Sequence, residues 1–325
     1  MHQSDQGPAF VENLLAEQGL PANDLVCVSS AGNQVWRTER HVIRISSGRF
    51  PGAFAHEARV VALIEGSVPV SPVLAHGVVA EREWIISERS HGQTVARAWS
   101  EMTRADQHSV GRQLGSVLKA LHATAVPAGF ENPWLSAAFH DPARLKDAYH
   151  PPPRLFPEFL RAAAALEGVD PDVLQQLEAY VASRLHCFTA AEENVLTHCD
   201  LHFDNLLWAD GAITAVLDFE GSRLAPRDQE LDTIVRFVRA PADYVGLPRG
   251  AEDVVDFAPA LDDIGTTYPE LFAGEDLVPR LEVYEVMWFL TELLHFPPRR
   301  RPHGPWRRLR EIVSSGSPIG AMLRR

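Results

Sequence analysis

The sequence predicts an α+β protein with two unequal lobes, a small β-rich N-lobe with one main helix and a larger, mostly helical C-lobe. Strand-like runs with a single long helical stretch among them fill residues 26–88, whereas the segments after Gly92 have helical periodicity. The chain has 325 residues, 46% of them hydrophobic, which is enough to form two cores. We therefore divide it into residues 1–88 and 89–325.

The N-lobe begins with a short helix near residues 10–20, where apolar residues recur at helical spacing until Gly19 and Pro21 end the run. One further helix is expected over residues 53–65. Runs rich in β-branched and aromatic residues predict strands at residues 26–28, 34–37, 41–45, 77–79 and 84–87.

The C-lobe contains three clear amphipathic patterns. Apolar stripes predict helices within residues 110–121, 173–185 and 280–296, and the prolines at 151–153 separate helices. The third stripe includes Tyr284, Trp288 and Phe289. We interpret these aromatic residues as core, because apolar residues at helical spacing usually pack inward.

The most informative segment is residues 198–205, followed by Asp218 thirteen residues after Asn205. Four residues separate Asp200 from Asn205. In a kinase-type catalytic loop this spacing separates the carboxylate that accepts a hydroxyl proton from the amide that holds a metal ion. Asp218 would add a second metal-binding carboxylate. The three residues predict a phosphoryl-transfer centre that uses Mg²⁺.

A hairpin would bring the two metal ligands together. Strand-like apolar runs flank Asp210 and Gly211, and Asp-Gly between such runs is a strong hairpin signal. If the chain reverses there, Asn205 falls opposite Val216. Asn205 and Asp218 would then finish at the same open end of the hairpin.

Composition limits the partners. The net charge of −13 argues against nucleic acid as the main partner, since phosphate backbones attract basic faces. No apolar run approaches the length needed to span a bilayer, so we expect no membrane partner. Three cysteines at unrelated spacings, after an N-terminus without an apolar signal core, favour a reducing cytoplasm.

One basic segment interrupts the acidic balance. It comprises residues 299–301 together with Arg307, Arg308 and Arg310. We interpret it as a solvated terminal helix rather than an anion-binding site, because charge runs usually face solvent.

Several motifs, taken in order, resemble those of the aminoglycoside phosphotransferase family, the small-molecule branch of the protein-kinase-like fold. Residues 196–202 with Asn205 are similar to its His-Gly-Asp catalytic motif, and residues 216–220 are similar to its metal-binding motif. Residues 84–92, 114–122 and 226–231 resemble its interlobe hinge, its Leu-His helix and its later helix start. The resemblance covers most of the chain. It implies a bilobal protein-kinase-like fold with ATP (or GTP) and Mg²⁺ as cofactors.

The resemblance also implies nucleotide-binding residues. Glu57 occupies the position of the family's helical Glu, and the backbone of Glu88 and Ser90 would face the adenine. Both lysines of the chain lie in the predicted C-lobe, so Arg44 is left to bind the nucleotide phosphates. A guanidinium can bind phosphate oxygens in a forked arrangement, and Glu57 can orient it.

The loop over the phosphates would lie at residues 29–33. Its small residues Ser30, Gly32 and Asn33 allow backbone N–H groups to approach an anion. The chain departs from the family at two positions. Cys199 stands where the family normally has Gly, and Arg44 stands where it often has Lys.

These observations predict an ATP-dependent O-phosphotransferase that acts on a hydroxyl of a small molecule, as a monomer or homodimer. We expect an antibiotic substrate, such as an aminoglycoside or a nucleoside, and hence a role in resistance. The alternatives are a kinase for sugars, choline-like or hydroxy-amino metabolites, and a non-catalytic nucleotide-binding pseudokinase. Acidic lining of the substrate pocket would indicate a cationic aminoglycoside, whereas an aromatic slot with few carboxylates would favour a nucleoside or other antibiotic.

A separate alternative is a zinc-binding module. His198, Cys199 and His202, with Cys187 or His186, are ligand types that zinc accepts. The paired spacing of a structural zinc site is absent, however, and this alternative leaves the Asp/Asn/Asp pattern unexplained.

The spacing of the catalytic segment yields a direct prediction. Asp200→Asn should lower turnover by at least about a hundredfold, with little change in ATP affinity, because it removes the general base and keeps the side-chain volume. Steady-state kinetics with ATP titration would measure both quantities. Turnover close to that of the wild type would refute the assignment of Asp200.

Overall fold

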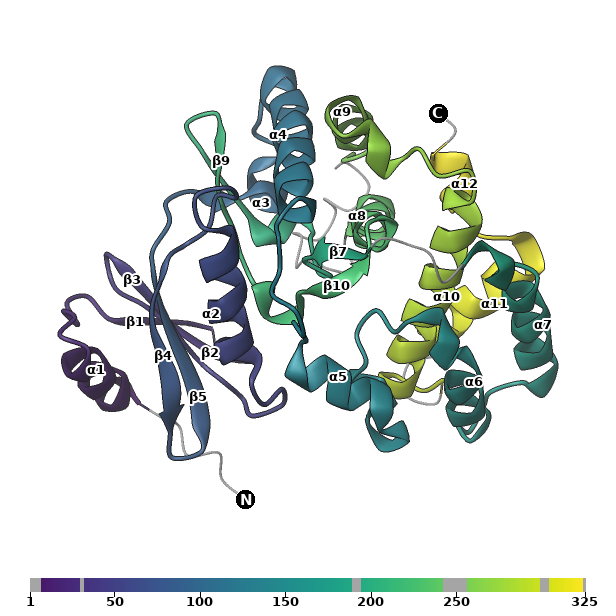
Figure 1. Ribbon diagram of the computed structural model, residues 1–325, viewed down its shortest axis with the longest axis horizontal. Helices are drawn as coiled ribbons and strands as arrows, with labels where there is room; N and C mark the ends of the chain where they lie inside the picture. The colour runs from purple at the N-terminus through teal and green to yellow at the C-terminus, as the bar shows by residue number, and fades with distance from the viewer. Residues whose placement is uncertain (1–6, 30–31, 189–193, 242–255, 299–303, 324–325) are drawn as a thin grey trace.

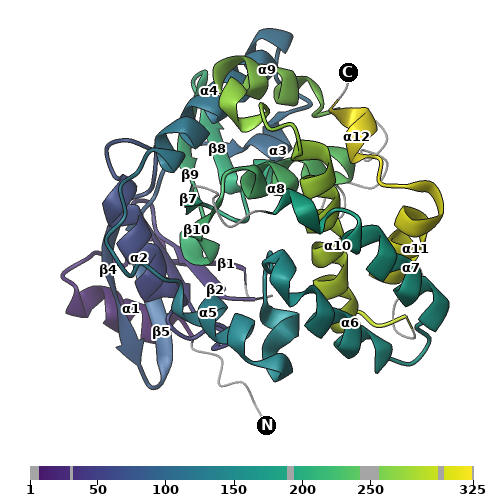
Figure 2. The same cartoon turned by 45° about the vertical axis from the view of Figure 1, so that its right-hand side comes forward.

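A computed structural model describes residues 7–29, 32–188, 194–241, 256–298 and 304–323 of the chain. It has the expected bilobal arrangement, with an antiparallel sheet at one end of the molecule and a helical body at the other (Figure 1). The segment from β7 to β10 lies between them in both views (Figure 2). The predicted α+β, protein-kinase-like fold class is confirmed. No helix in the described ranges is long and apolar enough to cross a membrane.

The N-lobe sheet has the order β1-β2-β3-β5-β4, and every pair in it is antiparallel. It is formed by β1 (Val26–Ser29), β2 (Gln34–Arg37), β3 (His41–Ile45), β4 (Val73–Val79) and β5 (Arg82–Glu88), with α1 (Pro8–Glu17) and α2 (Ala53–Ile64). The predicted strands are confirmed. The fourth is longer than residues 77–79, because it is an edge strand whose largely exposed residues lack a clear apolar pattern.

The two helices of the N-lobe pack on opposite faces of this sheet. Ile43 and Ile45 on β3 share a buried cluster with Leu14 and Leu15 of α1, whereas Phe54 of α2 clusters with Ile85. Side chains alternate between the faces of a strand. Arg44, between the two isoleucines, therefore faces α2, where it can meet a side chain of that helix.

The C-lobe consists mainly of helices, and its predicted stripes are confirmed for the first helix and shortened for the second. The apolar stripe of α4 is buried at all five of its positions, Val110, Leu114, Val117, Leu118 and Leu121. The second helix ends at Ala182, and Leu185 beyond it is 40% exposed. The helices are α3 (Val95–Ala98), α4 (Arg104–His122), α5 (Pro133–His140), α6 (Phe156–Ala164), α7 (Pro171–Ala182), α8 (Asp228–Arg239), α9 (Pro259–Thr267), α10 (Leu277–His295), α11 (Pro305–Ser315) and α12 (Ile319–Met322).

Two small sheets of the C-lobe carry the catalytic segment. β7 (Asn194–Thr197) pairs with β10 (Arg223–Pro226), while β8 (Leu206–Ala209) lies between β6 (Gln93–Thr94) and β9 (Ala212–Val216).

The β8–β9 hairpin has the predicted turn but a different register. Asp210 and Gly211 form a two-residue turn with φ angles of 51° and 80°, as a type I′ turn requires. A bulge then leaves Thr214 without a partner, so Leu206 rather than Asn205 lies opposite Val216. Asn205 thus lies one residue away from the predicted position roughly opposite Val216, and Asn205 and Asp218 do finish at the same open end of the hairpin, where the Leu217 N–H donates to the Asn205 carbonyl. The apolar pattern of the two strands does not indicate the bulge at Thr214.

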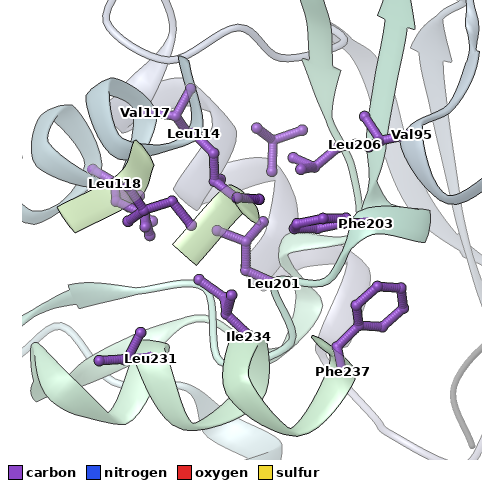
Figure 3. Packing of buried hydrophobic residues seen from close by; sticks show 14 of the residues in the cluster. Val95, Leu114, Val117, Leu118, Leu201, Phe203, Leu206, Leu231, Ile234 and Phe237 are labelled. Carbon is purple, nitrogen blue, oxygen red and sulfur yellow. The ribbon is translucent and has the colours of Figure 1, made fainter. Parts of the chain in front are cut away.

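The catalytic segment is anchored by its own apolar residues. Leu201 and Phe203 are both fully buried, on either side of His202. In Figure 3, Leu201 lies between Leu114 of α4 and Ile234 of α8, and Phe203 lies near Leu206. Because the neighbours of the loop's polar residues are locked in the core, the loop holds its shape without a ligand.

The close contact of α4 with α9 depends on a glycine. A Cβ atom added at Gly111 would lie 2.5 Å from Asp263 Cβ and 2.9 Å from the backbone oxygen of Ala260. Neither helix can accommodate such an approach without moving, so α9 would be displaced from the helix that supports the catalytic segment.

This contact predicts an unusual result for Gly111→Ala. Alanine normally stabilises a helix interior by up to about 1 kcal/mol. Here overpacking against α9 should instead lower the free energy of unfolding by about 2 kcal/mol. Urea unfolding would measure the change, with Ser116→Ala on the exposed face of the same helix as the control. A more stable Gly111→Ala variant would contradict the packing argument.

Candidate active site

Backbone and side-chain hydrogen bonds bring Asp200, Asn205 and Asp218 together. The Asn205 Nδ2 donates to the Asp200 carbonyl at 2.9 Å, and the Leu217 N–H donates to the Asn205 carbonyl at 2.9 Å. Asp218 follows directly, in the left-handed region at φ 67°, which Asp tolerates better than most residues. With its amide nitrogen committed to the loop, Asn205 keeps its side-chain oxygen for a metal ion.

The His198 side chain forms hydrogen bonds that join two parts of this loop. Its ring is fully buried, its Nε2 donates to the Leu217 carbonyl at 2.7 Å, and its Nδ1 accepts from the Asp200 N–H at 3.2 Å. This pattern needs a neutral ring, and burial lowers the His198 pKa to about 4. These contacts fix the shape of the loop.

Glu230 on α8 binds the backbone of the loop. Its side chain is fully buried and accepts the His198 N–H at 2.5 Å. Burial raises the pKa of Glu230 to about 7, although backbone N–H groups of the loop favour its charged form. The sequence placed Glu230 only within residues 226–231, which resemble the start of a later helix of the family. Its backbone contacts make it a positioning residue for the catalytic loop.

Asp200 lies at the edge of the cleft with 44% of its side chain exposed. Its pKa is raised to about 8, first by desolvation and then by the negative charge of Asp218, while Arg236 opposes both. A carboxylate whose pKa lies near neutrality is suited to accept a proton.

Arg44 joins the two lobes at the site. Its guanidinium forms an ion pair with Glu57 of α2, and its Nη1 donates to Asp218 Oδ1 at 3.0 Å. The Phe54 ring packs against the guanidinium, with its centroid 4.9 Å from Cζ. Although burial opposes the charge, Glu57 and Asp218 raise the pKa of Arg44 above its usual value, so it stays cationic.

Sequence reasoning missed Glu220. Carboxylate oxygens of Glu57, Asp218 and Glu220 lie within 4.8 Å of one another, and oxygen ligands of this kind suit Mg²⁺. Burial and the charge of Asp218 raise the pKa of Glu220 to about 8. No spacing rule pointed to Glu220, because it joins the cluster through the short 3₁₀ turn at Phe219–Gly221.

A cavity of about 270 Å³ lies between the lobes, where the nucleotide was expected. Arg44, Glu57, Ser90, Asn205 and Asp218 are all among the residues that line it.

Other predicted nucleotide-binding residues lie outside this lining. The N–H of Glu88 already donates to the Pro72 carbonyl at 2.9 Å, and the Asn33 side chain accepts the Ser47 N–H at 3.1 Å. Gly32 is exposed. Ser30 lies outside the described residues. Arg44 and the proposed metal ligands Asn205 and Asp218 therefore line one cavity, whereas the described residues of the predicted phosphate loop, Gly32 and Asn33, do not line it.

A second cavity, of about 330 Å³, opens beside Asp200. Tyr149, Trp288 and Phe289 line it, and all three are only partly buried. The interpretation of the α10 aromatic residues as core is confirmed for Tyr284, which is 3% exposed; Phe289 packs against a buried cluster and, like Trp288, also lines this cavity. Helical periodicity identifies a residue that faces inward, but not whether that side of the helix meets packed side chains or a pocket.

The zinc alternative is not supported at the catalytic loop. Both ring nitrogens of His198 are engaged, and Cys199 Sγ lies 3.1 Å from the Thr197 hydroxyl. In the part of the chain that the structure describes, the soft-ligand group that could hold a metal is elsewhere, at His186, Cys187 and Asp276.

The fold and the site together define a small-molecule kinase. The model of the phosphotransferase enzyme family matches residues 27–277, which is most of the chain. The protein therefore belongs to the phosphotransferase enzyme family. By sequence alone, no curated protein matches it.

Solved structures of aminoglycoside phosphotransferases share the fold. The ADP-bound APH(2'')-Ib has a TM-score of 0.63 at 14% identity, over 95% of this chain and 97% of that one. The ternary complex of streptomycin, ATP and APH(2")-IIa has a TM-score of 0.62 at 15% identity, over 100% and 98%. A thermostable mutant of APH(4)-Ia with AMP-PNP and hygromycin B has a TM-score of 0.60 at 18% identity, over 97% of each chain.

The departure at Cys199 has a conformational explanation and a test. Cys199 is 2% exposed and has a φ of 70°, where glycine is the unstrained residue. Cys199→Gly should keep turnover within about threefold of the wild type, whereas the β-branched Cys199→Val should lower the free energy of unfolding by about 2 kcal/mol. Thermal unfolding and steady-state kinetics would measure these effects. Equal stability of the valine variant would show that the left-handed conformation is not required.

Proposed function

We propose that the protein is an ATP-dependent O-phosphotransferase that phosphorylates a hydroxyl of a small molecule. The observation that carries the proposal is the meeting of Asp200, Asn205 and Asp218 at the cleft, with Arg44 reaching Asp218 from the other lobe. In this proposal residues 1–88 form the nucleotide-binding lobe and residues 89–325 form the catalytic and substrate-binding lobe.

ATP would lie in the cavity between the lobes. Its adenine would approach the backbone at Ser90, which lines the cavity, rather than the N–H of Glu88, which donates to the Pro72 carbonyl. Its phosphates would lie near Arg44, which Glu57 holds in place. Asn205 and Asp218 would hold Mg²⁺, with Glu220 close enough to contribute an oxygen. When bound, the ion would neutralise negative charge and align the phosphates for transfer.

Asp200 would orient the substrate hydroxyl and accept its proton as the phosphoryl group is transferred. Its partly exposed carboxylate faces the second cavity, and Asn205 fixes the backbone beneath it. Most of the rate enhancement would come from this alignment and from charge stabilisation rather than from covalent chemistry.

We further propose an antibiotic as the substrate, and hence a role in resistance. The similar solved structures include complexes with hygromycin B and streptomycin, which shows that this fold accommodates bulky hydroxyl compounds. The mixed aromatic lining beside Asp200 supports a ring-containing substrate rather than a simple amino alcohol.

An ADP-release assay across antibiotics, nucleosides and metabolites tests the proposal. We expect turnover with at least one hydroxyl compound and at least a hundredfold loss when EDTA removes divalent metal or when Asp218 is changed to Asn. Product analysis should place the phosphate on the hydroxyl. ATP binding without transfer to any compound would favour the pseudokinase. Stoichiometric zinc in the purified protein would favour the metal-binding module.

A further inference from the structure

Arginines outnumber carboxylates in the described lining of the cavity beside Asp200, although the chain as a whole is acidic. The whole protein has 43 acidic and 30 basic residues. Among the residues that the structure describes, four arginines nevertheless line this cavity together with two carboxylates, Asp200 and Glu292. The arginines are Arg236 and Arg239 from α8 and Arg307 and Arg308 from α11.

The counter-charges of the α8 arginines lie behind the cavity wall. Arg236 binds both oxygens of Asp232 through Nε and Nη2, at 3.0 to 3.1 Å, and Arg239 forms an ion pair with Glu285. Asp232 is fully buried and Glu285 is 1% exposed, and neither lines the cavity. These ion pairs hold the two guanidinium groups at the cavity wall, while Asp232 and Glu285 stay outside its lining.

The two α11 arginines complete the basic side. Both pair with Glu311, which lies outside the cavity lining, and they remain 49% and 36% exposed. Gly304 and Pro305, at the start of this eleven-residue helix, also line the cavity. The positive end of the helix dipole therefore adds to the arginines. The expected solvated helix is present as α11, and its partly exposed Arg307 and Arg308 also line the cavity.

The cavity also offers aromatic surface, next to Arg236. Trp288 lies with its ring centroid 4.1 Å from Arg236 Cζ, and the Tyr149 and Trp288 ring centroids are 6.0 Å apart. Such a wall suits a flat or partly apolar ring.

We propose that this cavity selects a ring-containing hydroxyl compound that carries an oxyanion, a carboxylate or a phosphate. The ring lies against Trp288 and Tyr149, the oxyanion meets the arginines of α8 and α11, and the hydroxyl reaches Asp200. In the described part of the lining, a polycationic ligand would face four guanidinium groups and two carboxylates. This inference rests on the proposed function and narrows its substrate class.

Binding to the ADP·Mg²⁺-saturated protein tests the inference separately from catalysis, because the nucleotide cleft is already filled. Calorimetry would compare uridine, uridine 5′-monophosphate, uridine 5′-carboxylate and the polycation kanamycin A. We expect both anionic probes to bind at least tenfold more tightly than uridine, and kanamycin A to bind no more tightly than uridine. The stronger of the two anionic probes identifies phosphate or carboxylate as the preferred oxyanion.

Two double variants that remove the same amount of charge test whether the α11 arginines cause the preference for anionic probes. Arg307→Gln with Arg308→Gln should reduce the advantage of the anionic probes over uridine by at least tenfold. Arg112→Gln with Arg161→Gln removes two other exposed, carboxylate-paired arginines that lie outside the cavity lining and should preserve that advantage. Thermal unfolding would confirm that both double variants are folded.

Two results would overturn the inference. One is tighter binding of kanamycin A, or of uridine, than of either anionic probe. The other is an anion preference that survives the loss of Arg307 and Arg308. Selective binding of the anionic probes without any phosphate transfer would instead support the inference and count against the proposed function.

Discussion

The buried hydrogen bonds of His198 are the constraint on which the rest of the site depends. Its ring joins the Asp200 backbone to the carbonyl of Leu217, and Glu230 holds its backbone from α8. The proposed base and the carboxylate of Asp218 thus share one rigid support. Buried polar groups are costly to leave unpaired, so this network fixes one arrangement of the loop.

Around this support the two lobes contribute charges of opposite sign. Arg44 comes from the sheet and Asp218 from the C-lobe, and Glu57 keeps the guanidinium in the cleft. Arg44 therefore contacts Asp218 at the place where nucleotide phosphates and a metal ion would bind. An arginine fits this position because its fork can contact two carboxylates at once, whereas a lysine offers a single charged nitrogen.

In the proposed function, the charge of the cavity beside Asp200 would direct the family fold to a ring-containing anionic substrate. The proposed catalytic residues lie on the loop and hairpin, while α8, α10 and α11 supply most of the wall against which a substrate would lie. Changes on these helices can alter the charge of the pocket without moving the loop, since their core-facing residues remain packed. An acidic chain can thus hold a locally basic pocket.

The sequence by itself determined the features that depend on local pattern. The spacing of Asp200 and Asn205, the Asp210-Gly211 turn and the apolar stripe of α4 each follow from residues close together in the chain. Only the tertiary structure decided the register shift at Thr214, the addition of Glu220 to the carboxylate cluster and the meeting of α8 and α11 arginines in one cavity. Periodicity identifies which side of an element faces inward. Packing between distant elements decides whether that side meets core or pocket.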